Sequence, residues 1–289
     1  MPCSIAKPGR SVAITGAGAG LGREIALGFA AKGYSVFGTA MSNEEVQNLK
    51  NASDGRVRPT VCDMTQAAAV QAWADVVSGA LGNAGLDFLI NNAGILTPGP
   101  IEVLALDAIR REFEVNVFGA LSVINAFLPA LRKARGRIVQ VSTWTASVPL
   151  PFNGPSGASK AAMEVFSAVY RAELKSFGID VVVAAAGNMR TGGPAKTAAA
   201  LARVADGMTP EQRALYGQAF DTFANTLNRM QSSGLDAVSA ATRVIELAEQ
   251  VPAPSRAAVG ADAEEMLRAA RENSDAELDT LRLQVVGLD

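Results

Sequence analysis

A glycine-rich turn near the start of the chain constrains its fold more than any other feature. Residues 15–22 read Thr-Gly-Ala-Gly-Ala-Gly-Leu-Gly and stand between an apolar run, residues 11–15, and a helix-prone stretch, residues 21–32. Glycine lets the backbone turn tightly and approach a ligand closely, while the N-terminus of the following helix supplies N–H groups and a positive dipole end. This order predicts a strand, a phosphate-binding turn and a helix, rather than a merely flexible connection.

Short apolar runs alternate with longer helix-prone stretches along the rest of the chain. Such alternation predicts βαβ units with right-handed connections, and therefore one α/β domain built on a parallel, doubly wound sheet. The predicted strands are residues 11–15, 34–39, 57–62, 86–91, 137–142, 179–185 and 257–259. The predicted helices are residues 21–32, 65–81, 106–134, 155–177 and 235–250. We expect a single domain over residues 1–289, with a helical tail over about residues 261–289.

The region from about residue 191 to 233 interrupts this alternation. It is too long for an ordinary connection between a helix and a strand. Apolar side chains recur within it at steps of four and three, which is the spacing of one helical face. They are Tyr216, Phe220, Phe223, Leu227 and Met230. Two interpretations fit this face equally well: a core helix, or a lid that covers an apolar substrate pocket.

Composition excludes several kinds of chemistry. The 289 residues include no histidine, which removes Ser-His-Asp and Cys-His catalysis and histidine-ligated zinc, so no metal site is expected. A net charge of −2 with scattered signs indicates neither nucleic acid nor an anionic membrane as a partner. No uninterrupted apolar run approaches the roughly 20 residues of a membrane span. The absence of a signal-like segment and of a cysteine motif around Cys3 and Cys62 predicts a cytoplasmic protein with reduced thiols.

Further motifs follow the predicted strands in order, and with the glycine-rich turn they resemble the short-chain dehydrogenase/reductase family over about residues 12–261. They are Cys62-Asp63, Asn91-Asn92-Ala93-Gly94, Asn116 within Phe-Glu-Val-Asn-Val-Phe-Gly, Ser142-Thr143, Ser159-Lys160-Ala161-Ala162 and the loop from Gly187 to Thr191, where Ala186 replaces the family's proline. The resemblance implies a Rossmann-type domain with strand order 3-2-1-4-5-6-7, helices on both faces, a helical substrate lid over about residues 191–233 and a nicotinamide dinucleotide cofactor. It implies these cofactor-binding residues: Thr15, Gly16, Gly18, Ala19, Gly20, Leu21, Gly22, Met41, Asp63, Asn92, Ala93, Gly94, Lys160, Gly187, Met189 and Thr191.

Some of these residues also have structural interpretations. Asp63 can cap the helix that follows it, Thr191 can do the same, and Asn92 can be a turn residue. Asn116 is harder to explain structurally, because asparagine is unfavourable inside a helix and competes for backbone hydrogen bonds. The phosphate-binding turn favours the functional interpretation of each.

The resemblance assigns the catalytic roles to Asn116, Thr143, Ser156 and Lys160. In the family a serine and a tyrosine polarise the substrate carbonyl, the tyrosine donates the proton, and the lysine binds the nicotinamide ribose and lowers the tyrosine pKa. The asparagine supports a water chain to that lysine. Here Thr143 stands at the serine position, and Ser156 replaces the tyrosine. A serine hydroxyl is a far weaker acid than a phenol and is shorter by a ring, so proton delivery must differ.

The segment after the second predicted strand bears on the choice of cofactor. A carboxylate there binds the ribose hydroxyls of NAD, whereas an arginine accepts the 2′-phosphate of NADP. Residues 38–42 contain neither, and Met41 stands where NADP-binding members of the family have an arginine. Because no carboxylate opposes a phosphate in this segment, the sequence favours NADP(H) over NAD(H).

Three functions follow from this combination. The first is a working reductase whose proton comes from Tyr216, from water near Lys160 or from the substrate, as in a protonated imine. The second is non-redox chemistry on a cofactor-binding scaffold, such as isomerisation or cyclisation, and the third is a cofactor-binding protein with little turnover. Residues 150–155 and 259–262 resemble the hydroxysteroid- and retinol-dehydrogenase-like branch, which implies a small apolar carbonyl or alcohol. The resemblance also implies a homodimer or homotetramer through the two long helices, with Val165 and Val169 as candidate contacts.

Overall fold

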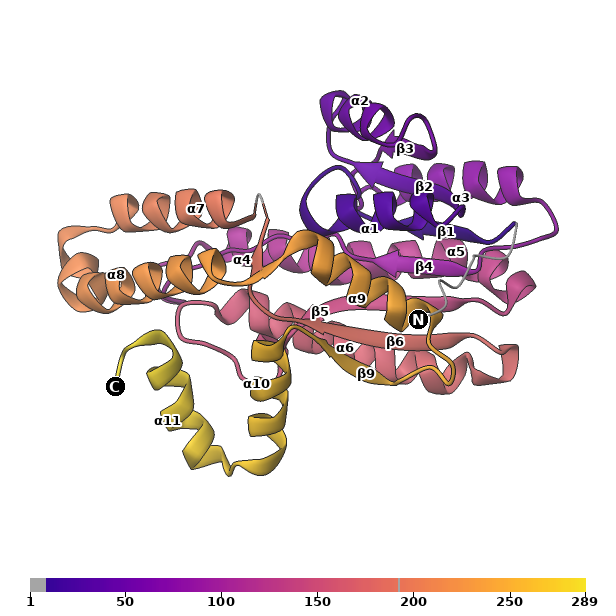
Figure 1. The fold of residues 1–289 in the computed structure, drawn as a ribbon. Coiled ribbons are helices and arrows are strands. Elements are labelled where there is room, and N and C mark those ends of the chain that lie inside the picture. Colours follow the sequence, from indigo (N-terminus) through magenta and orange to yellow (C-terminus); the bar gives the residue numbers. More distant parts are fainter. Residues whose placement is uncertain (1–8, 192) are drawn as a thin grey trace.

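A seven-stranded parallel sheet runs through the middle of the molecule (Figure 1). The structure is a computed structural model that describes residues 9–191 and 193–289, so Cys3 lies outside the described residues. The strand order is β3-β2-β1-β4-β5-β6-β9, which confirms the expected order of the seven sheet strands. The strands are β1 (Ser11–Ile14), β2 (Ser35–Ala40), β3 (Val57–Val61), β4 (Phe88–Asn91), β5 (Arg137–Thr143), β6 (Asp180–Ala186) and β9 (Arg256–Val259).

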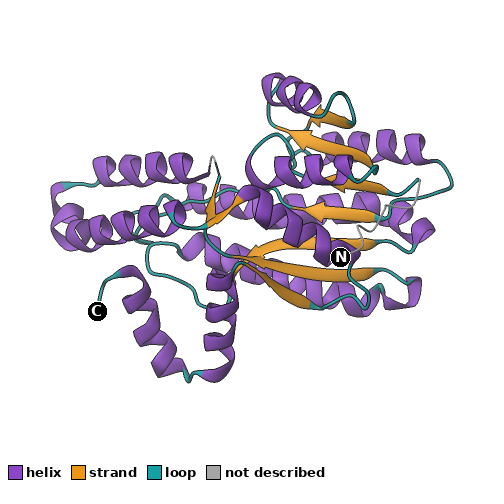
Figure 2. Cartoon of the chain, viewed as in Figure 1, coloured by secondary structure: helices purple, strands orange, loops and turns teal. Residues whose placement is uncertain are grey.

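Helices cover both faces of the sheet, as the doubly wound pattern predicts (Figure 2). One face carries α1 (Gly20–Ala31) and α9 (Ala237–Glu249), and its core includes Phe29 and Val244. The other carries α3 (Ala67–Leu81), α5 (Ala120–Ala134) and α6 (Gly154–Glu173), with the Trp73 and Phe127 rings 4.8 Å apart. Strands enclosed on both sides lose their exposed face, which is why β1 is apolar at consecutive positions rather than alternating.

Several boundaries differ from the sequence predictions. The helix predicted over residues 235–250 begins at Ala237, because Leu235–Asp236 forms a short strand, β8, that pairs with β7 (Met189–Arg190) in a separate two-stranded sheet. The helix predicted to reach residue 177 ends at Glu173, and Lys175–Phe177 forms a 3₁₀ turn. An additional helix, α2 (Asn43–Ala52), begins after Ser42.

The helical stretch Leu106–Ala134 is continuous but not uniform. It comprises α4 (Leu106–Phe113), a π-helical segment Glu114–Gly119, and α5. Within the described residues it is the one helix long and apolar enough to cross a membrane by length and composition. Its α5 part packs against β4 and α3 and buries Val123, Phe127 and Leu131, which is the packing of a core helix.

Four helices extend beyond the carboxyl ends of the strands and lie to the left of the sheet in Figure 1. They are α7 (Gly193–Gly207), α8 (Pro210–Ser232), α10 (Ala261–Glu272) and α11 (Asp275–Val286). On α8, Phe220 and Phe223 are fully buried and pack edge-on against the Phe152 ring, in a cluster with residues of α7, α10 and α11. The predicted apolar face, apart from Tyr216, therefore belongs to the core of this helical layer, and its residue Leu227 also lines a cavity.

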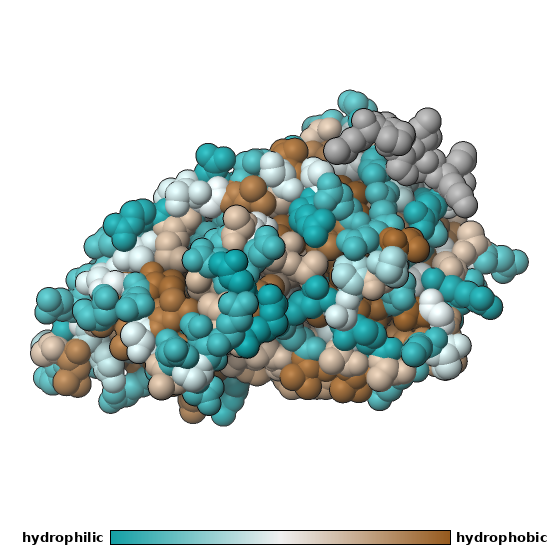
Figure 3. Space-filling model, turned by 60° about the horizontal axis from the view of Figure 1, so that its bottom comes forward, coloured by the Kyte–Doolittle hydropathy of each residue, from teal (hydrophilic) through white to brown (hydrophobic). Residues whose placement is uncertain are grey.

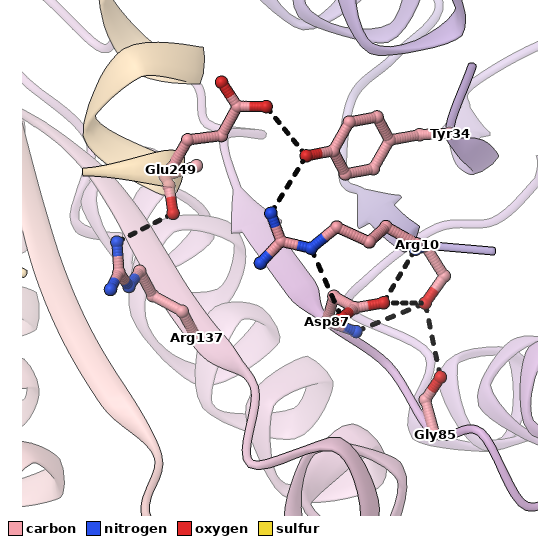
Figure 4. Close-up of polar contacts among 8 residues, drawn as sticks. Arg10, Tyr34, Gly85, Asp87, Arg137 and Glu249 are labelled. Atoms are coloured by element: carbon pink, nitrogen blue, oxygen red, sulfur yellow. Dashed lines mark hydrogen bonds and ion pairs between the residues drawn. The ribbon is translucent and has the colours of Figure 1, made fainter. Parts of the chain in front are cut away.

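A polar network ties the amino ends of the strands together (Figure 4). The Tyr34 hydroxyl donates to Glu249 at 2.7 Å and accepts from Arg10, which also pairs with Asp87. Arg137, at the start of β5, donates to backbone carbonyls at the end of α9. These bonds fasten α9 to the amino ends of the strands. The glycine-rich turn lies at the opposite, carboxyl ends, so we interpret the bonds as structural.

Candidate cofactor and active site

The glycine-rich turn connects β1 to α1 as the sequence predicts. Gly16 and Gly20 have φ angles of +67° and +54°, which glycine adopts without strain. The N-cap of α1 is Ala19, whose side chain has no acceptor for the first N–H groups of the helix, so they stay available to an anion. A Cβ on Gly22 would lie 2.2 Å from the Gly16 carbonyl oxygen, so only glycine permits this close packing.

Thr15, directly after β1, and Asn92, directly after the neighbouring strand β4, hold the turn in place. The Thr15 hydroxyl oxygen accepts from the backbone N–H groups of Asn92 and Ala93 at 2.9 and 3.0 Å. The Asn92 amide in turn donates to the Thr15 carbonyl at 3.0 Å. Thr15 is fully buried, so it braces the turn from behind, while Asn92 both braces it and faces the cavity described next.

A cavity of about 410 Å³ opens over the turn. Its position over a helix N-terminus and the carboxyl ends of β1, β2 and β4 is the one in which doubly wound folds bind dinucleotides. Most of the residues predicted to bind the cofactor line it, and these are Gly16, Gly18, Ala19, Gly20, Met41, Asp63, Asn92, Ala93, Gly94 and Thr191. Leu21, Lys160, Gly187 and Met189 line a second cavity instead, and Gly22 is buried in the turn.

Asp63 combines its two interpretations. One carboxylate oxygen accepts from the Thr65 backbone N–H at 3.0 Å and from the Thr65 hydroxyl at 2.8 Å, while the other lies 3.7 Å from Arg111. These partners, the Thr65 backbone first, hold the pKa of Asp63 below its usual value. The carboxylate therefore shapes the turn before α3 and stays charged at the rim of the cavity.

The cavity also contains an acid that the sequence analysis did not place there. Glu45, in the first turn of α2, folds back so that its carboxylate accepts from the Met41 backbone N–H at 2.9 Å. A Cβ on Gly18 would lie 2.5 Å from the same carboxylate oxygen, so Glu45 contacts the phosphate-binding turn. The signal was the spacing Ser42-x-x-Glu45, which is typical of a helix start with a folded-back glutamate.

A second cavity of about 310 Å³ adjoins the first, because Thr191 lines both. It brings together Thr143 from the end of β5, Ser156 from the first turn of α6, and Lys160 one turn later. The Thr143 oxygen accepts from the Thr145 backbone and hydroxyl at 3.3 and 3.4 Å, so its own proton is available for donation. Apolar side chains form much of the remaining wall, and among them are Leu21, Leu96, Trp144, Leu150, Met189 and Leu227.

Lys160 lies between this cavity and the cofactor cavity. Its ammonium group donates to the Val141 carbonyl at 3.0 Å, and a Cβ on Gly94 would lie 3.4 Å from it. Burial lowers the pKa of Lys160 to about 8, although the charges of Glu112 and Glu164 act in the opposite direction. Lys160 can therefore exchange a proton near neutral pH, which an ordinary lysine does not.

Asn116 lies in the π-helical segment, where the widened turn accommodates a side chain that bonds outside its own helix. Its amide oxygen accepts from the Ile95 N–H at 2.8 Å, and its amide nitrogen donates to the Ile95 carbonyl and to the Ser159 hydroxyl, both at 3.0 Å. Asn116 thus joins the segment after Gly94 to the helix that carries Lys160, as a residue that organises the site from behind.

The loop after β6 is held by the start of α10. Asp262 accepts from the backbone and the side-chain amide of Asn188 at 2.7 and 3.0 Å. A Cβ on Gly187 would lie 1.9 Å from the Asp262 carboxylate, which makes glycine necessary there. Asp262 therefore holds the start of the loop between Gly187 and Thr191.

None of the three tyrosines of the chain lies where it could donate a proton in the second cavity. Tyr34 donates to Glu249 (Figure 4), Tyr170 to Asn125, and Tyr216 to Glu102. Burial, followed by the Glu249 contact, raises the pKa of Tyr34 to about 12; burial also raises the pKa of Tyr170, and the Glu102 bond raises that of Tyr216. The cavity that holds Ser156 is lined by none of them, so delivery from Tyr216 finds no support in this geometry.

The fold and the two adjoining cavities define a dinucleotide-binding α/β enzyme. The sequence model of the short chain dehydrogenase family matches residues 10–201, and the chain therefore belongs to this family of NAD(P)-dependent enzymes. The NADPH-dependent 3-dehydrocapnine reductase of Ornithobacterium rhinotracheale is 28% identical over 244 residues, which cover 82% of this chain and 83% of that protein. Retinol dehydrogenase 16 of Mus musculus is 32% identical over 223 residues, covering 76% and 70%.

Solved structures agree with this assignment. The structure of a short-chain dehydrogenase from Streptomyces avermitilis superimposes with a TM-score of 0.77 at 25% identity, covering 98% of this chain and 100% of that one. The match includes the helical layer beyond the sheet, because it extends over nearly the whole chain.

Proposed function

We propose that the chain is an NAD(P)-dependent oxidoreductase that transfers a hydride between the nicotinamide and a small apolar carbonyl or alcohol, with Lys160 in place of the tyrosine as the proton donor. The observation that carries this proposal is the meeting of Thr143, Ser156 and Lys160 in one cavity beside the phosphate-binding turn. The resident cofactor would supply the hydride, and the first cavity has the glycine turn, the free helix N-terminus and the acidic rim that fit a dinucleotide.

The chain's own residues then have separate tasks. Thr143 donates a hydrogen bond to the substrate oxygen and orients it. Lys160, whose pKa is about 8, gives a proton to that oxygen when the carbonyl is reduced, directly or through the Ser156 hydroxyl. The apolar wall excludes water and selects a substrate with an apolar group beside its carbonyl. This agrees with the retinol and steroid dehydrogenases among the relatives.

The choice between the two cofactors turns on Glu45. The sequence favours NADP(H) because residues 38–42 hold no carboxylate, but Glu45 reaches the same place from α2 and contacts Gly18. A carboxylate beside the adenosine ribose accepts hydrogen bonds from its hydroxyls and repels a 2′-phosphate. We therefore infer that the wild-type protein binds NADH more tightly than NADPH, against the preference favoured by the sequence.

Calorimetric titration with NADH and NADPH tests this inference. Glu45→Gln keeps the shape of the side chain and removes its charge, so it should raise NADPH affinity more than NADH affinity. Glu44→Gln, at the exposed neighbouring position, is the matched control and should change neither. Tighter binding of NADPH than of NADH by the wild type would contradict the role of Glu45.

The oligomeric state is also proposed from the surface. Val165, Phe166 and Val169 on α6 and Phe118 on the π-helical segment are exposed, and they extend over the two long helices predicted to pair. On the face shown in Figure 3, hydrophobic areas are separate and lie among hydrophilic ones. We propose a homodimer or homotetramer through these two helices, in the cytoplasm.

A screen for NADH and NADPH oxidation with ketones, aldehydes and imines tests the catalytic proposal. We expect the wild type to oxidise the reduced cofactor when a carbonyl is present, and we expect the rate of this oxidation to be much lower in Lys160→Met. Oxidation with imines alone would place the proton on the substrate instead of on Lys160. Tight cofactor binding without any oxidation would favour non-redox chemistry or a protein with little turnover.

A further inference from the structure

The buried residue of α4 is a glutamate. Glu112 has no exposed surface, whereas the other side chains of this helix are at least partly exposed. An ionised carboxylate in such a place is unfavourable unless hydrogen bonds and an opposite charge compensate it. The groups around Glu112 therefore indicate what it does.

Both carboxylate oxygens of Glu112 accept hydrogen bonds from the active-site framework. One accepts from the Thr97 backbone N–H at 2.8 Å, and the other lies 3.3 Å from the Asn116 amide nitrogen, whose two hydrogens are shared with the Ile95 carbonyl and the Ser159 hydroxyl. Asn116 is one helical turn further along and contacts Ile95 and Ser159. Two accepted bonds from N–H donors fit the ionised form of the carboxylate, since a protonated carboxyl would need an acceptor.

The opposite charge that acts on Glu112 is the ammonium group of Lys160, and this group and the Asn116 side chain both lie against Gly94. The other charged groups around it have partners. Glu164, from α6, accepts from the Ser142 hydroxyl at 2.6 Å and pairs with Arg256 of β9 at 3.0 Å. Arg111, next to Glu112 in α4, is turned to Asp63. Both carboxylates act on Lys160, but Glu164 is paired with Arg256, and the effect of Glu112 is the larger.

We propose that Glu112 is a positioning residue that keeps Lys160 in its ammonium form, and so sustains the proton supply that a tyrosine provides elsewhere in the family. The proposal rests on the proposed reductase function. In that reaction a bound reduced nicotinamide would supply the hydride for the new C–H bond, the carbonyl oxygen takes a proton from the Lys160 ammonium, and solvent restores that proton. The carbonyl is reduced and the nicotinamide is oxidised. Glu112 neither gains nor loses a proton in the reaction.

The pKa values of the two groups agree with this role. Burial raises the pKa of Glu112 to about 7, against the Thr97 bond and the Lys160 charge, and the pKa of Lys160 lies at about 8. Above pH 7 the glutamate is charged and holds the proton on Lys160. Below pH 7 Glu112 is neutral, so its charge no longer acts on Lys160. At that pH Lys160 is protonated without the help of Glu112.

The test is the pH profile of carbonyl reduction by the wild type and by Glu112→Gln. The charge of Glu112 raises the pH at which the basic limb of the wild-type profile falls, so the variant's limb should shift to lower pH by about 1 unit, the lower end of the effect of an opposite charge. Well below pH 7 the two proteins should react at the same rate. Glu114→Gln, an exposed glutamate two residues away, is the control and should leave the profile unchanged.

A second measurement follows Lys160 without turnover. The rate at which acetic anhydride acetylates Lys160, read by mass spectrometry as a function of pH, reports its pKa in each folded protein. We expect a value near 8 in the wild type and a lower one in Glu112→Gln. An equal value in both proteins, or an ordinary lysine value in the wild type, overturns the proposal even if the chain reduces carbonyls. A lower value without any reduction would instead refute the proposed function and leave the coupling intact.

Discussion

A single substitution at Ser156 can introduce a phenol into the second cavity. Ser156→Tyr places a phenol one helical turn before Lys160 and beside Thr143, in the cavity of about 310 Å³. The ammonium group of Lys160 stabilises a phenolate, so it should lower the pKa of the new side chain from its usual value near 10. Thr143 keeps its hydrogen bond to the substrate oxygen.

The expected gain follows from the value of a positioned acid. General acid catalysis contributes about 10²–10⁴ in rate, which corresponds to about 2.7–5.4 kcal/mol of activation free energy. Lys160 is the proposed proton donor of the wild type, so the lower end, about 10², is the expected increase in kcat for carbonyl reduction. Ser156 is 9% exposed, so the ring must take space from the cavity, and KM for larger substrates should rise.

The assay is the loss of reduced-nicotinamide absorbance at saturating cofactor. Ser156→Phe is the matched control, because it fills the same space without an acidic hydroxyl. We expect the Tyr variant to be faster than the wild type and the Phe variant to be slower. Equal rates in the two variants would refute the reasoning. An activity that is present in the wild type and lost only in Ser156→Tyr would make the serine an adaptation to non-redox chemistry.

Three further predictions concern cofactor binding and assembly. Gly16→Val should abolish dinucleotide binding in calorimetry, because φ is +67° there and a Cβ would lie 3.0 Å from Ala93; near wild-type affinity would contradict the turn's role. Met41→Arg should tighten NADPH binding by about 1.5–3 kcal/mol through a charged hydrogen bond to the 2′-phosphate, and unchanged binding would place the phosphate elsewhere. Light scattering at micromolar concentration should show an oligomer that Val165→Asp weakens, and a monomeric wild type would remove that proposal.

The sheet and the phosphate-binding turn were predictable because each depends on local sequence. Apolar runs enclosed on both faces identify parallel strands, and glycines between a strand and a helix identify the turn. The expected strand order is confirmed, with β9 as the seventh strand. The two-stranded β7–β8 sheet is too short for a sequence pattern to reveal.

The sequence did not reveal the roles of Glu45 and Glu112, because both depend on tertiary contacts. Glu45 looks like an exposed residue at a helix start, and only the folded-back side chain brings it to Gly18. Glu112 stands among charged residues of an amphipathic helix, and only the folded chain shows that it is buried against Thr97 and Asn116. Local patterns report which residues start or interrupt helices, but not what those residues meet across the fold.

Transfer of deuterium from reduced nicotinamide labelled at C4 tests the central claim most directly. The labelled cofactor, in its NADH and NADPH forms, would be incubated with a panel of apolar ketones and aldehydes, and the products analysed by mass spectrometry. We expect one deuterium on the carbinol carbon and a rate that falls as pH rises through about 8, where Lys160 loses its proton. Cofactor bound at saturation with no deuterium in any product would contradict this claim.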